Sequence, residues 1–320
     1  MIPGPERGGR LVADVGGTNT RVALFDEGDR QLIAVRRYRN QDFAGLEAVL
    51  SRWLEDCPEA QPREACIAVA APPDGDTATM SNCNWSFSGR ELAARFGWDR
   101  VGLINDFQAN AFALPWLKPT DWHEIQPGNS AYPRLATVGP GTGLGGAVLD
   151  CSSMPHRAVA CEPGQMTLAP QNLLELELWR VLLRQHSRIY TELLLSGPGL
   201  PRLYQALAAV QGVAAETLSG EAISARALAG TDSLCTATLR QFCALLGTAS
   251  ADFVLASGAF GGLYLAGGIL PRFPEFLQQS EFHLRFTDRG PMHGHLDRMP
   301  VRVIVHSQPG LLGAAYAPLP

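Results

Sequence analysis

Lysine is almost absent from this sequence of 320 residues, because Lys118 is the only one and arginine supplies the other positive side chains. No Gly-x-x-x-x-Gly-Lys-Ser/Thr motif occurs, which excludes a nucleotide site built on a phosphate-binding P-loop lysine. The sequence has no basic run, and its formal net charge is −5, so it lacks the electrostatic footprint of a nucleic-acid-binding protein. Any phosphate chemistry must therefore use backbone N–H groups, hydroxyls and a metal ion.

Long apolar runs and paired cysteines are missing as well. No apolar stretch reaches the about 18 residues that a membrane span needs, and residues 1–10 contain no apolar signal core, which predicts only a short loose tail. The seven cysteines are scattered and lack C-x-x-C spacing, so they indicate reduced thiols rather than a metal site. We expect a cytoplasmic protein with neither a nucleic-acid nor a membrane partner.

The length of the chain is ample for two domains. A strand-rich start followed by alternating helices and strands is repeated after residue 134, and the crossover at 115–134 is the best boundary. We therefore expect a small lobe over 1–116, completed by a C-terminal helix at about 307–320, and a large lobe over 117–306. A hinge between two such lobes predicts an active site in the cleft that separates them.

The most informative segment is residues 11–25, where two apolar runs flank a glycine-rich turn. The runs predict strands, and the turn predicts a tight hairpin. Asp14, just before the turn, is placed to hold Mg²⁺ against an anion bound there. A plain hairpin at a sheet edge is the alternative. Backbone and side-chain donors to the anion come from Gly16, Gly17, Thr18 and Asn19.

Residues 137–149 repeat this plan of strand, glycine turn and strand. The stretch Gly141-Thr-Gly-Leu-Gly-Gly146 also matches the dinucleotide fingerprint G-x-G-x-x-G, but that interpretation needs a helix after the glycines, and 147–150 predicts a strand. Two glycine hairpins, each opening one half of the chain, favour a duplicated domain that holds phosphates between its copies. The second turn contributes Gly141, Thr142 and Gly143.

Together the two turns resemble the two phosphate motifs of the actin-like sugar-kinase superfamily. Four further segments, in the same order along the chain, resemble those of the bacterial ATP-dependent glucokinase family: Ile104–Phe107, Leu195–Leu200, Phe260–Ile269 and Pro309–Gly313. The resemblance implies an α/β fold of two actin-like (ribonuclease H-like) lobes, each with a mixed sheet flanked by helices, and a cleft between them. By family analogy it also implies a homodimer.

This resemblance implies ATP-dependent phosphorylation of glucose at its 6-hydroxyl, with ATP and Mg²⁺ as cofactors. Asp106, at the end of a predicted strand, would be the base that accepts the hydroxyl proton, and Asn105 would contact the sugar. From the residues alone, Asp106 could equally cap the following helix. Two other functions stay open: a kinase of another hexose or amino sugar, and a weakly active paralogue that binds sugar and nucleotide as a sensor.

The remaining expected ligands also follow from the resemblance. In the family, the stretch that matches Glu162–Gln165 reads Glu-Gly-Gly-His or similar, so Gln165 stands where the family has a histidine, and this puts the sugar preference in doubt. A solvated loop acid for Glu162 and a helix-surface acid for Glu192 are the alternatives to sugar contacts. The expected sugar ligands are Asn82, Asn105, Asp106, Glu162, Gln165 and Glu192. Backbone approach to adenosine is expected at Gly261, Gly262, Gly267 and Gly268, whose alternative role is close packing.

Overall fold

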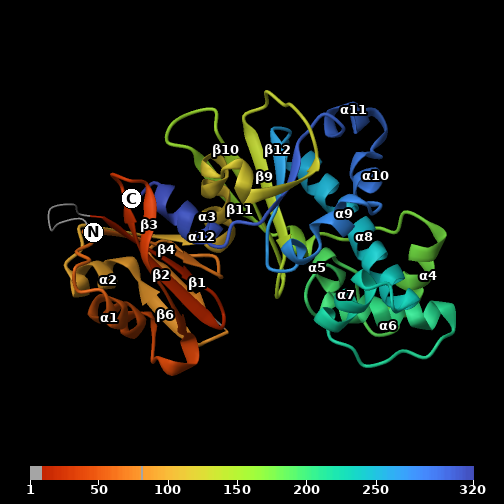
Figure 1. Cartoon of the computed structure of the whole chain (residues 1–320), viewed down its shortest axis with the longest axis horizontal. Coiled ribbons are helices and arrows are strands. Elements are labelled where there is room, and N and C mark those ends of the chain that lie inside the picture. Colours follow the sequence, from red (N-terminus) through yellow and green to blue (C-terminus); the bar gives the residue numbers. More distant parts are fainter. Residues whose placement is uncertain (1–8, 81) are drawn as a thin grey trace. The chain divides into compact units, whose positions relative to one another are not determined.

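The computed structural model describes residues 9–80 and 82–320, so most of the tail expected at residues 1–10 lies outside the described part. The chain forms two compact units (Figure 1). The first comprises Met1–Leu117, Ser153–Ala160 and His306–Pro320, and the second comprises Lys118–Ser152 and Cys161–Val305. The C-terminal segment thus belongs to the first unit, and so does Ser153–Ala160, which the sequence had placed in the large lobe.

A mixed five-stranded sheet forms the centre of the first unit, in the order β3-β2-β1-β4-β7. β1 pairs antiparallel with β2 and parallel with β4, and β4 pairs parallel with β7. The glycine turn joins β1 to β2, as the apolar runs on either side of the turn residues predict. The strands are β1 (Arg10–Val15), β2 (Asn19–Asp26), β3 (Gln31–Arg39), β4 (Glu64–Val69) and β7 (Arg100–Asn105).

Helices cover this sheet. The apolar stripe of α1 (Leu46–Asp56) is buried through Val49, Leu50 and Trp53, which join the side chains of β1 and β4 in one core. The C-terminal helix α12 packs on β1 and on α3, and Arg10 of β1 donates hydrogen bonds to the carbonyls of Ala315 (2.9 Å) and Ala317 (2.7 Å) at its end. The other elements are β5 (Thr77–Met80), β6 (Trp85–Ser88), α2 (Gly89–Phe96), α3 (Asp106–Ala113) and α12 (Pro309–Tyr316).

The second unit repeats the same plan. An antiparallel pair, β9 and β10, lies beside a parallel strand, β12, in the order β10-β9-β12-β13-β8. The strands are β8 (Trp122–Gln126), β9 (Arg134–Pro140), β10 (Leu144–Asp150), β12 (Gly262–Leu265) and β13 (Val301–Ile304), while most of β11 (Arg157–Cys161) falls in the Ser153–Ala160 segment. Mixed sheets with a repeated hairpin confirm the duplication expected from the two glycine turns.

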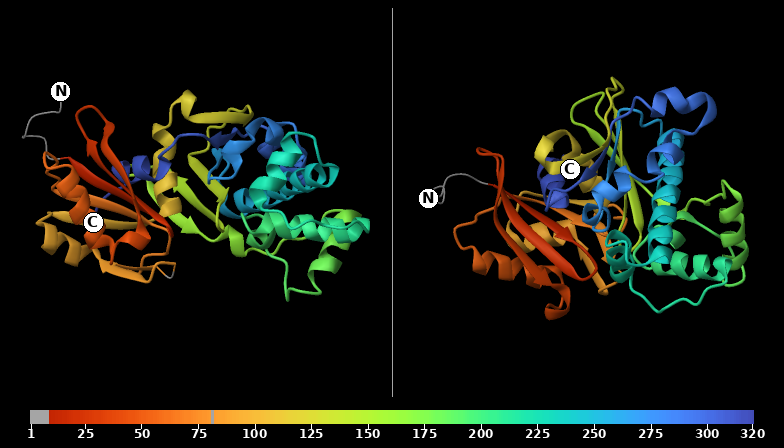
Figure 2. Two further views of the ribbon diagram at one scale, coloured as in Figure 1. Left: turned by 60° about the horizontal axis from the view of Figure 1, so that its bottom comes forward. Right: turned by 45° about the vertical axis from the view of Figure 1, so that its right-hand side comes forward.

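The long helix α8 (Ser233–Ser257) organises the helices of this unit, because α6, α7 and α10 all pack against it (Figure 2). Its inner face is apolar and includes Leu239, Phe242 and Leu246, all fully buried. The helices of the unit are α4 (Leu173–Leu182), α5 (Thr191–Leu194), α6 (Gly199–Gln211), α7 (Gly220–Leu228), α8, α9 (Pro274–Gln278), α10 (Phe282–Thr287) and α11 (His293–Leu296).

Candidate functional site

The first glycine turn closes on itself and is held by one buried side chain. The Gly16 N–H donates to the carbonyl of Asn19 (3.0 Å). Asn40, which is 3% exposed, donates from its side-chain amide to the Gly16 carbonyl (2.7 Å) and from its backbone N–H to the Thr18 carbonyl (2.9 Å). Its amide oxygen accepts from the hydroxyl of Thr20 (2.9 Å). Asn40 therefore fixes the shape of the turn, a role that no motif in the sequence indicated.

Asp14 lies near the end of β1, directly across from Arg21 in the β1–β2 register. Arg21 Nη1 donates to Asp14 Oδ2 at 3.1 Å. Burial raises the pKa of the Asp14 carboxyl, and the charge and hydrogen bond of Arg21 oppose that rise. The start of α12 closes over the same carboxyl group, because a Cβ at Gly310 would lie only 3.2 Å from its carboxyl carbon.

This environment bears on the expected Mg²⁺. Among the described residues, no group of three or more His, Cys, Asp or Glu side chains is placed to hold a metal ion. Mg²⁺ is commonly bound through one or two carboxylates together with substrate phosphates and water, rather than by a cage of protein ligands. A single carboxylate beside a phosphate-type turn fits that mode, and a bound cation would offset the charge of Asp14, whose side chain is partly buried.

Asn105 and Asp106 stand where β7 ends and α3 begins. Asn105 is the N-cap: its side-chain oxygen accepts from the backbone N–H groups of Phe107 (2.9 Å) and Gln108 (3.3 Å), and Gln108 Oε1 accepts from the Asn105 N–H (3.0 Å). Asn105 therefore has the capping role that the sequence left open for Asp106. Asp106 is the first helical residue, and its Oδ1 accepts from the adjacent Phe107 N–H (2.9 Å).

The second glycine turn is braced by Glu192. Its carboxylate accepts from the Leu144 N–H (2.8 Å), and a Cβ at Gly143 would come within 2.4 Å of its Oε2, so a larger residue there would displace Glu192. The same side chain lies against Gly164, within the Glu162–Gln165 stretch. Glu192, expected as a sugar ligand, thus joins the expected phosphate turn to the expected sugar segment within one unit.

Gln165 is exposed, at the end of a short 3-10 turn (Pro163–Gln165) that follows Glu162. Its Oε1 accepts from Arg188 Nη2 at 2.9 Å, and the Arg188 guanidinium lies over the ring of Tyr190, 4.8 Å from the centroid. The amide of Gln165 is therefore oriented with its NH₂ group left as the donor. Glu162 is also exposed, so both side chains are accessible to a ligand.

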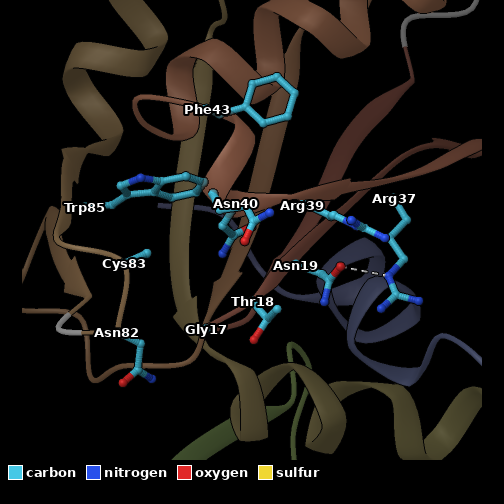
Figure 3. Close-up of a pocket in the computed structure, with 11 residues that line it drawn as sticks. Gly17, Thr18, Asn19, Arg37, Arg39, Asn40, Phe43, Asn82, Cys83 and Trp85 are labelled. Carbon is cyan, nitrogen blue, oxygen red and sulfur yellow. Dashed lines mark hydrogen bonds between the residues drawn. The ribbon is translucent and has the colours of Figure 1, made fainter.

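A cavity of about 620 Å³ opens beside the first turn (Figure 3). Gly17, Thr18 and Asn19 line it on the turn side, and Asn82 lies close enough that a Cβ at Gly17 would come within 3.1 Å of its amide nitrogen. The structure therefore brings Asn82, expected on the sugar side, against the first phosphate turn. Trp85 lines the same cavity while being 5% exposed, so it serves both the core and the cavity wall.

Comparison with known proteins identifies the family of the chain. A family model described as Glucokinase matches residues 11–319. The chain belongs to the glucokinase family. Curated glucokinases of Saccharophagus degradans and Tolumonas auensis are 38% and 39% identical, and each alignment covers 95% of this chain, with 96% and 95% of the relative.

Solved structures of glucokinases share the fold. The crystal structure of a glucokinase from an Antarctic psychrotroph superposes with a TM-score of 0.88 at 36% identity, covering 96% of this chain and 98% of that one. A ROK family glucokinase from Streptomyces griseus, in complex with glucose and AMPPNP, has a TM-score of 0.65 at 19% identity, covering 96% and 97% of the two chains. The expected fold class is thereby confirmed.

Not every glycine of the glucokinase motifs lies at a glycine turn. Gly267 has a φ of +89° and packs against the Pro140 carbonyl, next to the second turn, and Gly268 has open space around it. Gly261 lies at the opposite end of β12, where a Cβ would come within 2.3 Å of the Tyr132 carbonyl. Gly261 and Gly262 are thus not brought to the turn, and at Gly261 close packing between backbones explains the residue.

Among the described residues, no histidine belongs to a group of three or more side chains placed to hold a metal ion. Across residues 9–80 and 82–320, no helix combines the length and the apolar character needed to cross a membrane.

Proposed function

We propose that this chain transfers the γ-phosphoryl group of ATP to the 6-hydroxyl of glucose, giving ADP and glucose 6-phosphate. The observation that carries the proposal is the match to the glucokinase family over residues 11–319, with every proposed ligand inside the matched range. The curated relatives at 38–39% identity carry the glucokinase name, which does not favour a kinase of another sugar or a sensor.

Asp106 is the proposed base. Its carboxylate takes the proton of the glucose 6-hydroxyl as the new O–P bond forms and the bond from the γ-phosphorus to the bridging oxygen of ADP breaks. Its place at the first position of α3 supports this role, because the helix start fixes its backbone. Since the side-chain oxygen of Asn105 is engaged in the cap, we propose that its amide NH₂ donates to a sugar hydroxyl.

The proposed phosphate ligands are the two glycine turns. Neither turn has a lysine, so backbone N–H groups and hydroxyls must carry the recognition. Asp14 would hold Mg²⁺, which when bound offsets negative charge on the phosphates. The proposed phosphate donors are Gly16, Gly17, Thr18, Asn19, Gly141, Thr142 and Gly143, and Gly267 and Gly268 are proposed to border the nucleotide.

The proposed sugar ligands, besides Asn105 and Asp106, are Asn82, Glu162, Gln165 and Glu192. The exposure of Glu162 and Gln165 supports access to a sugar, and the position of Glu192 between them and the second turn supports a shared site.

A coupled assay of ADP formation tests the proposal, with glucose, mannose, fructose, galactose and glucosamine compared at equal ATP. We expect kcat/KM to be highest with glucose. A higher kcat/KM with another sugar would show that this sugar, and not glucose, is the substrate. The absence of turnover with any of the five would support the sensor alternative.

We further propose that the protein is a homodimer. Helix α4 and the residue after it expose leucines at positions 173, 176 and 183, which are 81%, 46% and 51% exposed. Their spacing puts them along one stripe of the helix, and an unpartnered apolar stripe of this kind is typical of an association surface. We propose that a second copy of the chain covers it.

A further inference from the structure

The cavity beside the first turn carries an unbalanced positive charge. Within the described part of the chain, the side chains that line it include Arg37 and Arg39 but no aspartate or glutamate. The chain as a whole has a net charge of −5, so this local excess runs against the overall balance. A cavity that served a neutral sugar alone would have no need of two guanidinium groups.

Both arginines are presented by alternation along β3. Residues two apart on a strand share a face, and Arg37 and Arg39 stand opposite Arg21 and Asn19 in the β2–β3 register. Arg37 Nε donates to Asn19 Oδ1 at 3.0 Å. Among the described residues, neither Arg37 nor Arg39 forms an ion pair, so no acidic side chain in that part of the chain neutralises either guanidinium group.

The rest of the lining suits a sugar. Figure 3 shows the ring of Trp85 on the opposite side of the cavity from Arg37, with the ring of Phe43 above and Thr18 below, near the turn. Aromatic rings and side-chain amides, here including Asn82 and Gln41, are the groups that recognise a sugar ring and its hydroxyls. A volume of about 620 Å³ lies within the usual range of small-molecule sites.

We propose that this cavity binds a hexose phosphate, with Arg37 and Arg39 recognising the phosphate and the aromatic and amide groups recognising the sugar. Guanidinium groups bind phosphate through paired, charge-assisted hydrogen bonds, so two of them make a specific phosphate subsite. Because Gly17 and Thr18 line the same cavity, a bound hexose phosphate also inhibits phosphoryl transfer. The ligand is either the product of the proposed reaction or another hexose phosphate, and only the first source rests on that reaction.

Calorimetry on the full chain, without ATP, tests the proposal directly. Glucose 6-phosphate, fructose 6-phosphate, inorganic phosphate, ADP and glucose are titrated into the wild type and into Arg37→Ala, Arg39→Ala and Arg36→Ala. Arg36 is the matched control, since it is an exposed arginine of the same strand that does not line the cavity. We expect Arg37→Ala and Arg39→Ala each to weaken hexose phosphate binding by about tenfold or more. Arg36→Ala should bind hexose phosphates about as tightly as wild type, and glucose binding should stay close to wild type in all three variants.

Cys83 provides an independent readout because it lines the cavity and is partly exposed. A saturating hexose phosphate should slow its alkylation by iodoacetamide, measured by peptide mass spectrometry, in the wild type and not in Arg39→Ala. A higher affinity for glucose 6-phosphate than for fructose 6-phosphate identifies the product as the ligand, and the reverse order identifies another sugar phosphate.

Three results would overturn the proposal. Arg37→Ala and Arg39→Ala could bind hexose phosphates as tightly as wild type does, or inorganic phosphate could bind as tightly as the hexose phosphates. The two substitutions could also weaken the binding of ADP alone. The last would assign the arginines to the nucleotide. The hexose assay of the wild type is separate, so a failure of the proposed kinase reaction is distinguished from a failure of this site.

Discussion

Asp14 carries a carboxylate at a place where burial disfavours its charge. Because burial raises the pKa of Asp14 above its usual 3.8, the folded protein holds a proton there more tightly than the unfolded chain does. Stability is therefore lost as pH rises from about 3.8 through the raised pKa, and the loss is complete above it. Asp14→Asn removes this loss, so we expect the variant to melt at a higher temperature than wild type at pH 7.

The pH dependence of melting checks this explanation. The difference in melting temperature between Asp14→Asn and wild type should shrink as pH is lowered through the raised pKa, because the folded protein then takes up the proton, and it should vanish only below about 3.8, where the unfolded chain is protonated as well. Asp29→Asn, at an exposed acid of the same unit, controls for the loss of one charge. An equal or lower melting temperature of Asp14→Asn at pH 7 would show that Arg21 fully compensates the partly buried carboxylate.

Gln165 occupies the position where the resembled family has a histidine. We expect Gln165→His to lower the KM for glucose by roughly two- to tenfold, the effect of regaining one hydrogen bond of about 0.5–1.5 kcal/mol. The KM for ATP should change little and serves as the internal control. Steady-state kinetics of both proteins decide the point, and a wild type that matches the histidine variant on glucose would show that Gln165 is no handicap.

Single residues differ in how far the sequence could predict them. Asn105 and Asp106 at the end of a predicted strand indicated a site. The sequence could not tell which of the two caps α3, because a helix starting one residue later would make Asp106 the cap. Asn40 could not be found at all, since its role depends on contacts with Gly16, Thr18 and Thr20, which only pairing of β2 with β3 brings near.

At the scale of elements, the first glycine turn depends on Asn40. We expect Asn40→Ala to destabilise the protein by about 1–3 kcal/mol, because it leaves the partly buried Gly16 carbonyl and the buried Thr20 hydroxyl without this partner. A displaced turn should also raise the KM for ATP several-fold while sugar affinity stays nearly constant.

Chemical denaturation and steady-state kinetics measure the two effects. Gln31→Ala, at an exposed position of β3, is the control and should leave both values close to wild type. If Asn40→Ala raised the KM values for sugar and ATP equally, its effect would be a general loss of structure rather than a displaced turn.

Most elements could be predicted because their periodicity is local. The apolar runs of β1 and β9 and the 3.6-residue stripe of α1 are visible in the sequence. β8 (Trp122–Gln126) was missed because its residues mix aromatic, charged and polar types, and its place beside β13 is set by long-range pairing. The motif glycines at 261 and 262 lie at the end of β12 away from the second turn, which spacing along the chain could not show, and their approach to adenosine stays a prediction.

At the scale of the whole molecule, we expect light scattering after size exclusion to give twice the chain mass of 34.4 kDa. Leu176→Glu on α4 should shift the protein to the monomer, because a buried charge would oppose association. Leu284→Glu, at another exposed leucine (60%), is the control and should remain dimeric. A monomeric wild type, or an unchanged dimer in Leu176→Glu, would contradict the proposal that a second copy of the chain covers the leucines of α4.

The proposed reaction depends on one carboxylate more than on any other group. Asp106→Asn keeps the shape and hydrogen bonding of the side chain but removes the proton acceptor, so kcat for glucose phosphorylation should fall roughly 10²–10⁴-fold. Glucose affinity, measured by calorimetry on the same protein, should fall only modestly. The decisive measurement is kcat of Asp106→Asn against wild type with glucose and ATP at saturation: a fall of that size is the predicted result, and a near-wild-type kcat would contradict the assignment of Asp106 as the base.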